Sequence, residues 1–204
     1  MNDTTRTLEN LEFVGGAACL DFANTTNSRL YPEHDYLMQY SDLVDWVNKA
    51  GLLSPAQTSQ LQKQAKQNPE AAGKTLAAAR TLRELFYRLF SNAAKGSELD
   101  KKDMGAFITS YGDAISHALL IRHEDHYTTT WKLDESLDAV LCPIIYSAGE
   151  LLLSKELTQV KECPGCGWLF LDTSKNQSRR WCSMNTCGAR DKMRRYHTKQ
   201  RKKK

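Results

Sequence analysis

The sequence lacks any long apolar run. A membrane-spanning helix needs about 20 consecutive apolar residues, whereas the longest apolar stretch here lies near residues 139–148 and is broken by Pro143. The first 20 residues are interrupted by charged side chains from Asp3 to Glu12, so they contain no signal-peptide core. We therefore expect a cytoplasmic protein that has no membrane partner.

Familiar catalytic motifs are absent as well. The sequence contains no G-x-S-x-G elbow, no P-loop, no H-E-x-x-H pair and no dinucleotide-binding fingerprint. It also has no internal repeat and no low-complexity linker. With 204 residues, 41% hydrophobic and 25% charged, it can form one ordinary globular domain and a small appendage. An enzyme remains the rival class, but we expect a protein that is not an enzyme.

Four cysteines near the C-terminus form the most specific pattern in the chain. Two residues separate Cys163 from Cys166, fifteen separate Cys166 from Cys182, and four separate Cys182 from Cys187. Pro164 and Gly165 make the first pair a tight knuckle. Four thiolates at this spacing predict one structural, tetrahedral Zn²⁺ with no coordination position left for catalysis.

Other interpretations of the cysteines exist. Iron in a rubredoxin-like site would use the same four thiolates, and two unrelated pairs of buried cysteines would need no metal. Disulfides are rare in cytosolic proteins. Cys19 and Cys142 lie in apolar runs, where a free cysteine behaves as a small hydrophobe, so we expect both in the core.

The charge of the chain is divided unevenly. The chain has a net charge of +4. Its C-terminal segment, residues 188–204, has nine basic residues and one acid, whereas the rest of the chain has 19 basic and 23 acidic residues. An acidic body would repel a polyanion, so a nucleic acid should be bound by the C-terminal end. The alternative is a solvated tail that only aids solubility, but its position directly after the metal site argues against that alternative.

Helical signals dominate the body. An extended segment is expected over 11–24. Asp100 and Asp103 should begin a helix whose inward face carries Phe107, Ile108 and Tyr111. The other expected elements are a helix after Ser41 that stops at Gly51, a helix opened by Ser54-Pro55, a long helix over 69–94, a hairpin over 118–133 that turns near Glu124, and a helix from Asp134 to Leu152 that Pro143 kinks or divides. The two helices around 42–50 and 55–67 lack a base-reading arginine, which favours a packed αα-hairpin over a DNA-binding helix-turn-helix.

The metal-binding part should be a knuckle, a hairpin and a helix. Residues 168–172 are typical of a short strand, residues 173–180 of a polar turn, and a helix capped by Ser183 or Asn185 should begin around Cys187. The fold class is therefore mainly α (α+β), with a helical domain over 1–156 and, over 157–204, a treble-clef-like four-cysteine zinc finger that ends in a basic helix. The connection is so short that the two parts should be docked.

The stretch CPGCGWLFLDTSKNQSRRWCSMNTCGAR resembles the CGNR zinc finger, and the body resembles the ABATE domain that usually precedes this finger. The matching pieces of the body are CLDFANT at 19–25, LRELFYRLF at 82–90, and the helix that contains Pro143 and Glu150. The resemblance implies a bacterial stress-response regulator of transcription that binds DNA. The asparagine for which the finger is named is Ala189 here, so a capping or phosphate contact made by that asparagine would be missing.

We hypothesise that zinc fixes the hairpin and aims basic side chains at DNA. Arginines can read guanine edges, whereas lysines more often contact phosphates. The candidate nucleic-acid-binding residues are Arg179, Arg180, Arg190, Lys192, Arg194, Arg195 and Lys199. The alternatives are RNA binding and a protein–protein adaptor that docks through the finger.

The body is the natural place for a regulator to sense a small-molecule effector or to form a homodimer. Asp21, Asn24 and Thr25 alternate with apolar neighbours and are candidate residues of a ligand pocket. The alternative, which the residue types favour, is a structural role in capping turns and binding backbone.

Overall fold

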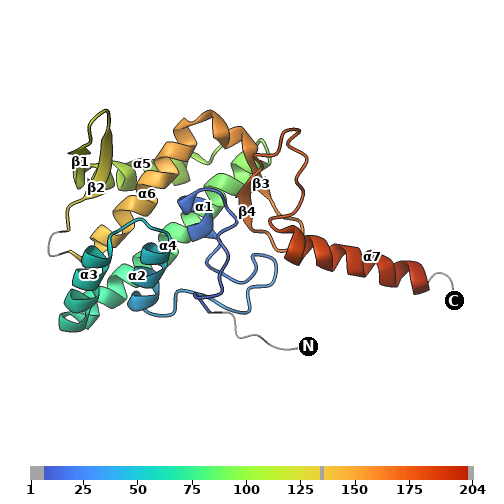
Figure 1. The fold of residues 1–204 in the computed structure, drawn as a ribbon, viewed down its shortest axis with the longest axis horizontal. Helices are drawn as coiled ribbons and strands as arrows, with labels where there is room; N and C mark the ends of the chain where they lie inside the picture. Colours follow the sequence, from blue (N-terminus) through green and yellow to red (C-terminus); the bar gives the residue numbers. More distant parts are fainter. Residues whose placement is uncertain (1–6, 134–135, 202–204) are drawn as a thin grey trace.

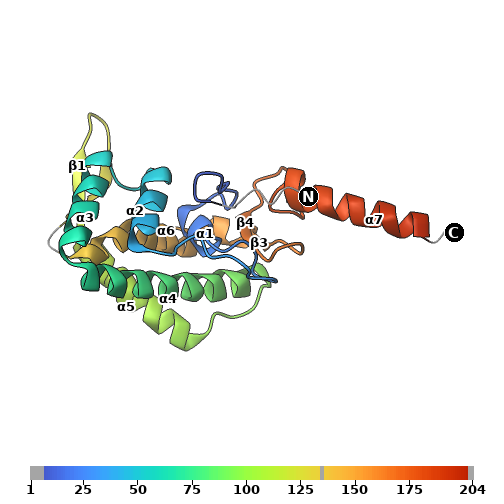
Figure 2. The ribbon, with the colours of Figure 1, turned by 90° about the horizontal axis from the view of Figure 1, so that it is seen from below.

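The computed structural model describes residues 7–133 and 136–201. The body consists of a helical layer around one central helix, and the finger follows it at one end (Figures 1 and 2). In chain order the elements are α1 (Ala18–Ala23), α2 (Tyr40–Lys49), α3 (Pro55–Gln67), α4 (Pro69–Ala94), α5 (Lys101–Ser116), β1 (Ala118–Arg122), β2 (Tyr127–Trp131), η1 (Leu137–Leu141), α6 (Cys142–Leu153), η2 (Lys155–Gln159), β3 (Val160–Glu162), β4 (Leu169–Leu171), η3 (Met184–Gly188) and α7 (Ala189–Arg201).

The expected mainly helical fold with two small hairpins is confirmed. β1 pairs with β2 and β3 with β4, each antiparallel. α4 is the central helix and contacts α1, α2, α3, α5 and both strands of the second hairpin. Its core side chains include the fully buried Phe86, Leu89 and Phe90. Cys19 and Cys142 are buried in the same core, as expected.

Local capping signals placed several helices correctly. Ser54 and Gln57 form the expected reciprocal capping box of α3, and Pro55 occupies its first turn. Asn68 caps α4, and Asp100 caps α5 by accepting from the backbone N–H groups of Lys102 and Asp103. Such caps satisfy backbone donors that a helix start leaves free, so they can be read from sequence alone.

The extended segment expected over 11–24 is wrong, because its second half is the helix α1. Gly16 adopts a positive φ of 81° and turns the chain, after which Cys19, Leu20 and Phe22 are all buried. A short run that is apolar on every side has no periodicity that separates a strand from a buried helix. No side chain caps this six-residue helix, so the sequence carried no start signal.

Two smaller corrections concern α2 and α5. α2 begins at Tyr40, before Ser41, because Gln39 and Asp42 form its capping box. Ile108 is 62% exposed on α5 and does not face inward, whereas Phe107 is buried. The division expected at Pro143 is confirmed, since η1 precedes it and α6 has the proline in its first turn. The expected cap Asp134 lies outside the described residues.

The described residues contain no helix that is both long and apolar enough to cross a bilayer.

Candidate zinc centre and nucleic-acid interface

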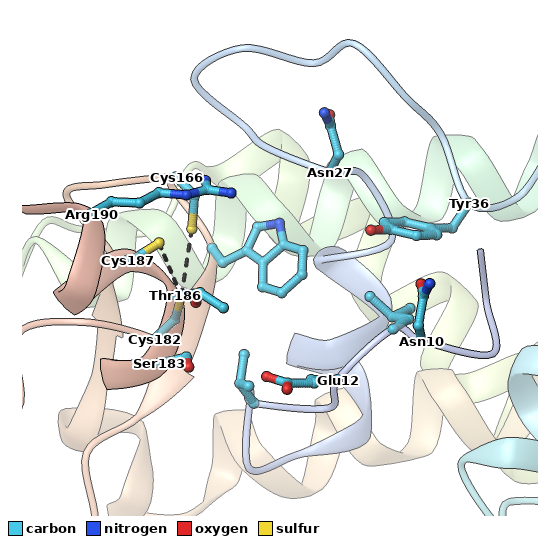
Figure 3. Close-up of a pocket in the computed structure, with 13 residues that line it drawn as sticks. Asn10, Glu12, Asn27, Tyr36, Cys166, Cys182, Ser183, Thr186, Cys187 and Arg190 are labelled. Atoms are coloured by element: carbon cyan, nitrogen blue, oxygen red, sulfur yellow. Dashed lines mark hydrogen bonds between the residues drawn. The ribbon is translucent and has the colours of Figure 1, made fainter. Parts of the chain in front are cut away.

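Cys163, Cys166, Cys182 and Cys187 form one buried cluster whose sulfur atoms all lie within 4.8 Å of one another. The Cys182 sulfur is 3.5 Å from that of Cys166 and 3.8 Å from that of Cys187 (dashed lines in Figure 3). Tetrahedral zinc with Zn–S bonds of about 2.3 Å requires sulfur–sulfur distances of about 3.8 Å. The donor set and its spacing therefore fit one four-coordinate zinc ion.

The turn between β3 and β4 positions the first two cysteines. Gly167 N–H donates to Cys163 O at 2.7 Å, and Cys163 N–H donates to Trp168 O at 2.8 Å. Gly167 has a φ of +74°, a conformation that favours glycine. The tight turn brings the two thiols to the same side of the hairpin, as the knuckle pattern predicted.

Sulfur atoms packed this closely perturb each other's protonation. The hydrogen bond with Cys166 lowers the pKa of the Cys163 thiol, while the contacts with Cys163 raise the pKa of Cys166 and of Cys182. A divalent cation is needed to stabilise four thiolates at once, which is why binding would be coupled to proton release.

The last cysteine lies in η3, a π-helical turn that continues directly into α7. The expected side-chain cap is wrong: Ser183 occupies the position before this turn, but its side chain accepts no capping hydrogen bond, and Asn185 lies inside the turn. Gly188 N–H donates instead to Ser183 O at 3.1 Å. The metal-binding turn and the basic helix are thus one continuous element.

β4 connects the metal cluster with the core of the body. Leu169 and Leu171 belong to the main core, whereas Phe170 belongs to the small cluster of the four cysteines and Trp181. Successive side chains of a strand point to opposite faces, which explains this division. The finger therefore shares the body's core in addition to its own, and the expected docking of the two parts is confirmed.

Arg179 supports the metal loop from outside the ligand set. Its Nε donates to Trp181 O at 2.9 Å, its guanidinium also hydrogen bonds to Cys182 O, and its Cζ lies 4.6 Å from the centroid of the Phe170 ring. These contacts hold the backbone next to the third cysteine. Arg179, one of the seven candidate nucleic-acid residues, therefore uses its donors to stabilise the backbone of the metal loop.

A buried carboxylate organises the polar turn before Arg179. Asp172 accepts hydrogen bonds from Lys161 Nζ at 2.6 Å, from the Ser174 hydroxyl at 2.6 Å and from Arg179 N–H at 2.8 Å. Burial alone raises the pKa of Asp172, but these hydrogen bonds outweigh burial and hold the pKa below its ordinary value. The side chain is thus a fixed anion that folds the turn back onto β3.

The remaining candidate residues lie on or near α7, which projects away from the rest of the molecule (Figures 1 and 2). Arg180, Arg190, Lys192 and Lys199 are exposed and form no ion pair within residues 7–133 and 136–201. Arg194 and Arg195 each contact Asp191, at 2.8 and 2.5 Å, although their side chains remain 77% and 66% exposed.

Comparison with protein families gives two matches. Residues 16–155 match the ABATE model, described as "Putative stress-induced transcription regulator", and residues 159–200 match the CGNR zinc finger. The chain belongs to the ABATE family. Its C-terminal part is a CGNR zinc finger, whose four clustered cysteines can hold one zinc ion. No curated protein matches the chain.

The ABATE domain contacts the CGNR finger through the loop after α1. Asn24 Nδ2 donates to Leu169 O at 2.8 Å, and Leu169 N–H donates to Asn24 Oδ1 at 2.9 Å. Arg29 N–H donates to Cys166 O at 2.7 Å, and Trp168 Nε1 donates to Thr26 O at 2.8 Å. Backbone at a zinc ligand is therefore held directly by the neighbouring domain.

The three candidate pocket residues are all buried and bonded within the chain. Asp21 accepts from Gly15 N–H at 2.7 Å, and the Thr25 hydroxyl donates to Phe22 O at 2.8 Å. Asn24 makes the pair of bonds to Leu169 described above. These side chains shape the α1 turn and the contact between domains, in keeping with the structural alternative that the residue types favoured.

Sequence reasoning missed three supporting residues: Arg29, Lys161 and Asp172. For Asp172 a signal existed, because an Asp two residues before a Ser at a strand end is typical of an Asx turn. Arg29 and Lys161 carried no such signal, since their partners lie far away in sequence. Ala189, in place of the asparagine, is the exposed first residue of α7.

Proposed function

We propose that this ABATE-family protein regulates transcription by binding duplex DNA through its CGNR finger and α7. The projecting helix supports this proposal most strongly. α7 carries six basic residues and one acid, and it stands clear of the acidic body (Figure 1). Its 13 residues are about 20 Å long. A helix of this kind fits the major groove of B-DNA.

The basic side chains would contact different parts of the DNA according to their positions. Arg190, in the first turn of α7, and Arg180, beside the metal loop, can donate two parallel hydrogen bonds to a guanine edge or a phosphate. Lys192 and Lys199 would act as point charges on the backbone. Arg194 and Arg195 keep exposed donors beside Asp191 and would add to the positive electrostatic potential that attracts the phosphates.

Charge also orients the molecule. Because residues 1–187 hold more acids than bases, the body is repelled by the polyanion while α7 is attracted. The ABATE domain would then face away from DNA, where it can respond to an effector or contact a second copy. If the protein dimerises, we expect the two copies to bind a DNA site with twofold symmetry.

Salt dependence of duplex binding tests the proposal. Fluorescence anisotropy of a labelled random-sequence duplex, measured from 50 to 300 mM salt, should give a log–log slope of roughly −4 to −5, because each neutralised phosphate contributes about −0.9. The triple variant Arg190→Gln, Lys192→Gln, Lys199→Gln should reduce the slope by roughly 3.

A matched control separates this interface from general charge. The variant Lys63→Gln, Lys66→Gln, Arg122→Gln removes the same charges from α3 and β1 and should leave DNA binding unchanged. Equal losses in both variants, or binding that salt does not affect, would contradict the proposal. Preference for a single-stranded RNA competitor over duplex DNA would instead favour RNA as the ligand.

A further inference from the structure

A cavity of about 470 Å³ lies between the CGNR finger and the N-terminal segment of the body. One wall is formed by the N-terminal segment of the body, and the other by the finger (Figure 3). The lining residues of the first wall are Asn10, Leu11, Glu12, Val14, Asn27 and Tyr36, and those of the second include Cys166, Cys182, Cys187, Thr186 and Arg190. The volume falls within the roughly 300–1,000 Å³ that is typical of small-molecule sites. Such sites often form where two domains meet.

Two side chains of opposite charge line this cavity. Arg190 comes from the finger side, and Glu12 comes from the N-terminal segment on the other side (Figure 3). In the part of the chain that the structure describes, neither side chain has an ion-pair partner. Apolar surface from Leu11, Val14 and Trp168 also lines the cavity.

We propose that this cavity binds a small zwitterion with an apolar body, of the chemical class of an aromatic amino acid. The guanidinium of Arg190 would hold the carboxylate, because an arginine can donate two parallel hydrogen bonds to it. Glu12 would hold the ammonium group. The ring would pack on Trp168 and Val14, since aromatic pairs stabilise each other beyond simple burial.

The site would also regulate the finger, and this part rests on the proposed DNA-binding function. Arg190 is both a wall of the cavity and a DNA contact of α7. A ligand that engages Arg190 withdraws that contact, so ligand and DNA oppose each other. The coupling is reciprocal: each lowers the affinity for the other by the same factor, on the order of 5- to 10-fold.

Binding is tested first without DNA. Saturation-transfer NMR on the zinc-loaded full chain compares L-phenylalanine, 3-phenylpropionate and 2-phenylethylamine, which present the zwitterion, the anion and the cation on the same ring. L-Phenylalanine should bind tightest and 2-phenylethylamine weakest. Arg190→Gln should remove the preference for a carboxylate, and Glu12→Gln should remove the advantage of the ammonium group.

Two further variants sharpen the test. Val14→Trp fills the apolar part of the cavity and should abolish the signal, while Arg122→Gln on β1 makes the same chemical change as Arg190→Gln far from the cavity and should preserve it. Both Glu12 and Arg190 are exposed, so their substitutions leave the core intact. No signal from any probe, or signals that the three cavity variants Arg190→Gln, Glu12→Gln and Val14→Trp leave unchanged, would overturn the proposal.

Adding DNA distinguishes the two proposals. If L-phenylalanine binds the cavity and weakens duplex binding of the wild type but not of Arg190→Gln, the regulatory link is supported. If the probe binds but the protein has no affinity for DNA, the proposed function fails while the cavity site stands. If both bind without affecting each other, the shared role of Arg190 is refuted.

Discussion

Asn24 and Leu169 are joined by two hydrogen bonds, of 2.8 and 2.9 Å, although 145 residues separate them in sequence. The side-chain amide of Asn24 pairs with both backbone groups of Leu169, as a neighbouring strand would. Both residues are buried. The zinc finger and the ABATE domain therefore form one packed unit, and a change in either domain can reach the other through this contact.

Replacing Asn24 by alanine should destabilise the protein by roughly 2–4 kcal/mol, because a buried N–H and a buried C=O of Leu169 lose their partners. Urea unfolding of the zinc-loaded protein measures the loss. Asn48→Ala, at an exposed position of α2, is the control and should cost well under 1 kcal/mol. Equal small losses at both positions would mean that the Asn24 pair does not hold the domains together.

Gly167→Ala should disturb the knuckle for two reasons. Its positive φ is strained for alanine, and an added Cβ would lie 2.7 Å from the Cβ of Arg29. Gly96 has a similar φ of 65° but open space around it, so Gly96→Ala measures the strain alone. We expect Gly167→Ala to lose at least about 1 kcal/mol more than Gly96→Ala in thermal or urea unfolding. Similar losses of stability in the two variants would show that the loop carrying Arg29 shifts at little energetic cost to accommodate the added Cβ.

Arg179 and Arg190 should behave differently, although both are basic residues of the finger. Arg179→Gln removes hydrogen bonds to the backbone of Trp181 and Cys182, so it should accelerate zinc transfer to a chromogenic chelator by about 10- to 100-fold. Arg190→Gln should leave that transfer rate unchanged and weaken DNA binding. Faster zinc transfer in Arg190→Gln together with an unchanged rate in Arg179→Gln would refute the structural role of Arg179.

The stability of the ABATE domain should depend on pH through Asp21. Burial raises the pKa of this carboxyl to about 6, although hydrogen bonds from Gly15 and Val14 oppose the shift. The folded state therefore binds the proton more tightly, and the stabilisation from protonation is full below about pH 4 and is lost as the pH rises through 6.

The comparison with Asp21→Asn isolates this effect, because zinc release at low pH is common to both proteins. The difference in unfolding free energy, wild type minus variant, should fall by up to about 3 kcal/mol between pH 4 and pH 7. A difference that stays constant with pH would show that Asp21 titrates normally in the folded protein.

Local signals were readable from the sequence where a few adjacent residues determine the outcome. The capping box at Ser54, the cap at Asp100 and the cysteine spacing each describe backbone and ligand geometry within a short stretch. α1 was missed because its residues are buried on all sides, so that no polar face revealed the helical period.

Long-range partners could not be read in the same way. The sequence singled out Asn24, but nothing near it points to Leu169, and Arg179-Arg180 looked like a pair of equivalent DNA contacts. The roles of the two arginines differ only in the folded turn, which places the guanidinium of Arg179 over the ring of Phe170. The pairing of Arg194 and Arg195 with Asp191, by contrast, follows from helical spacing and was available in the sequence.

The central claim is that zinc holds the finger in the form that presents α7 to DNA. It is tested most directly by titrating zinc into metal-stripped protein while duplex binding is followed by anisotropy, with Cys182→Ser in parallel. The account predicts that affinity rises with zinc, saturates at one equivalent per chain and stays low in the variant. Full DNA affinity in the metal-stripped protein, or the same affinity in Cys182→Ser, would contradict it.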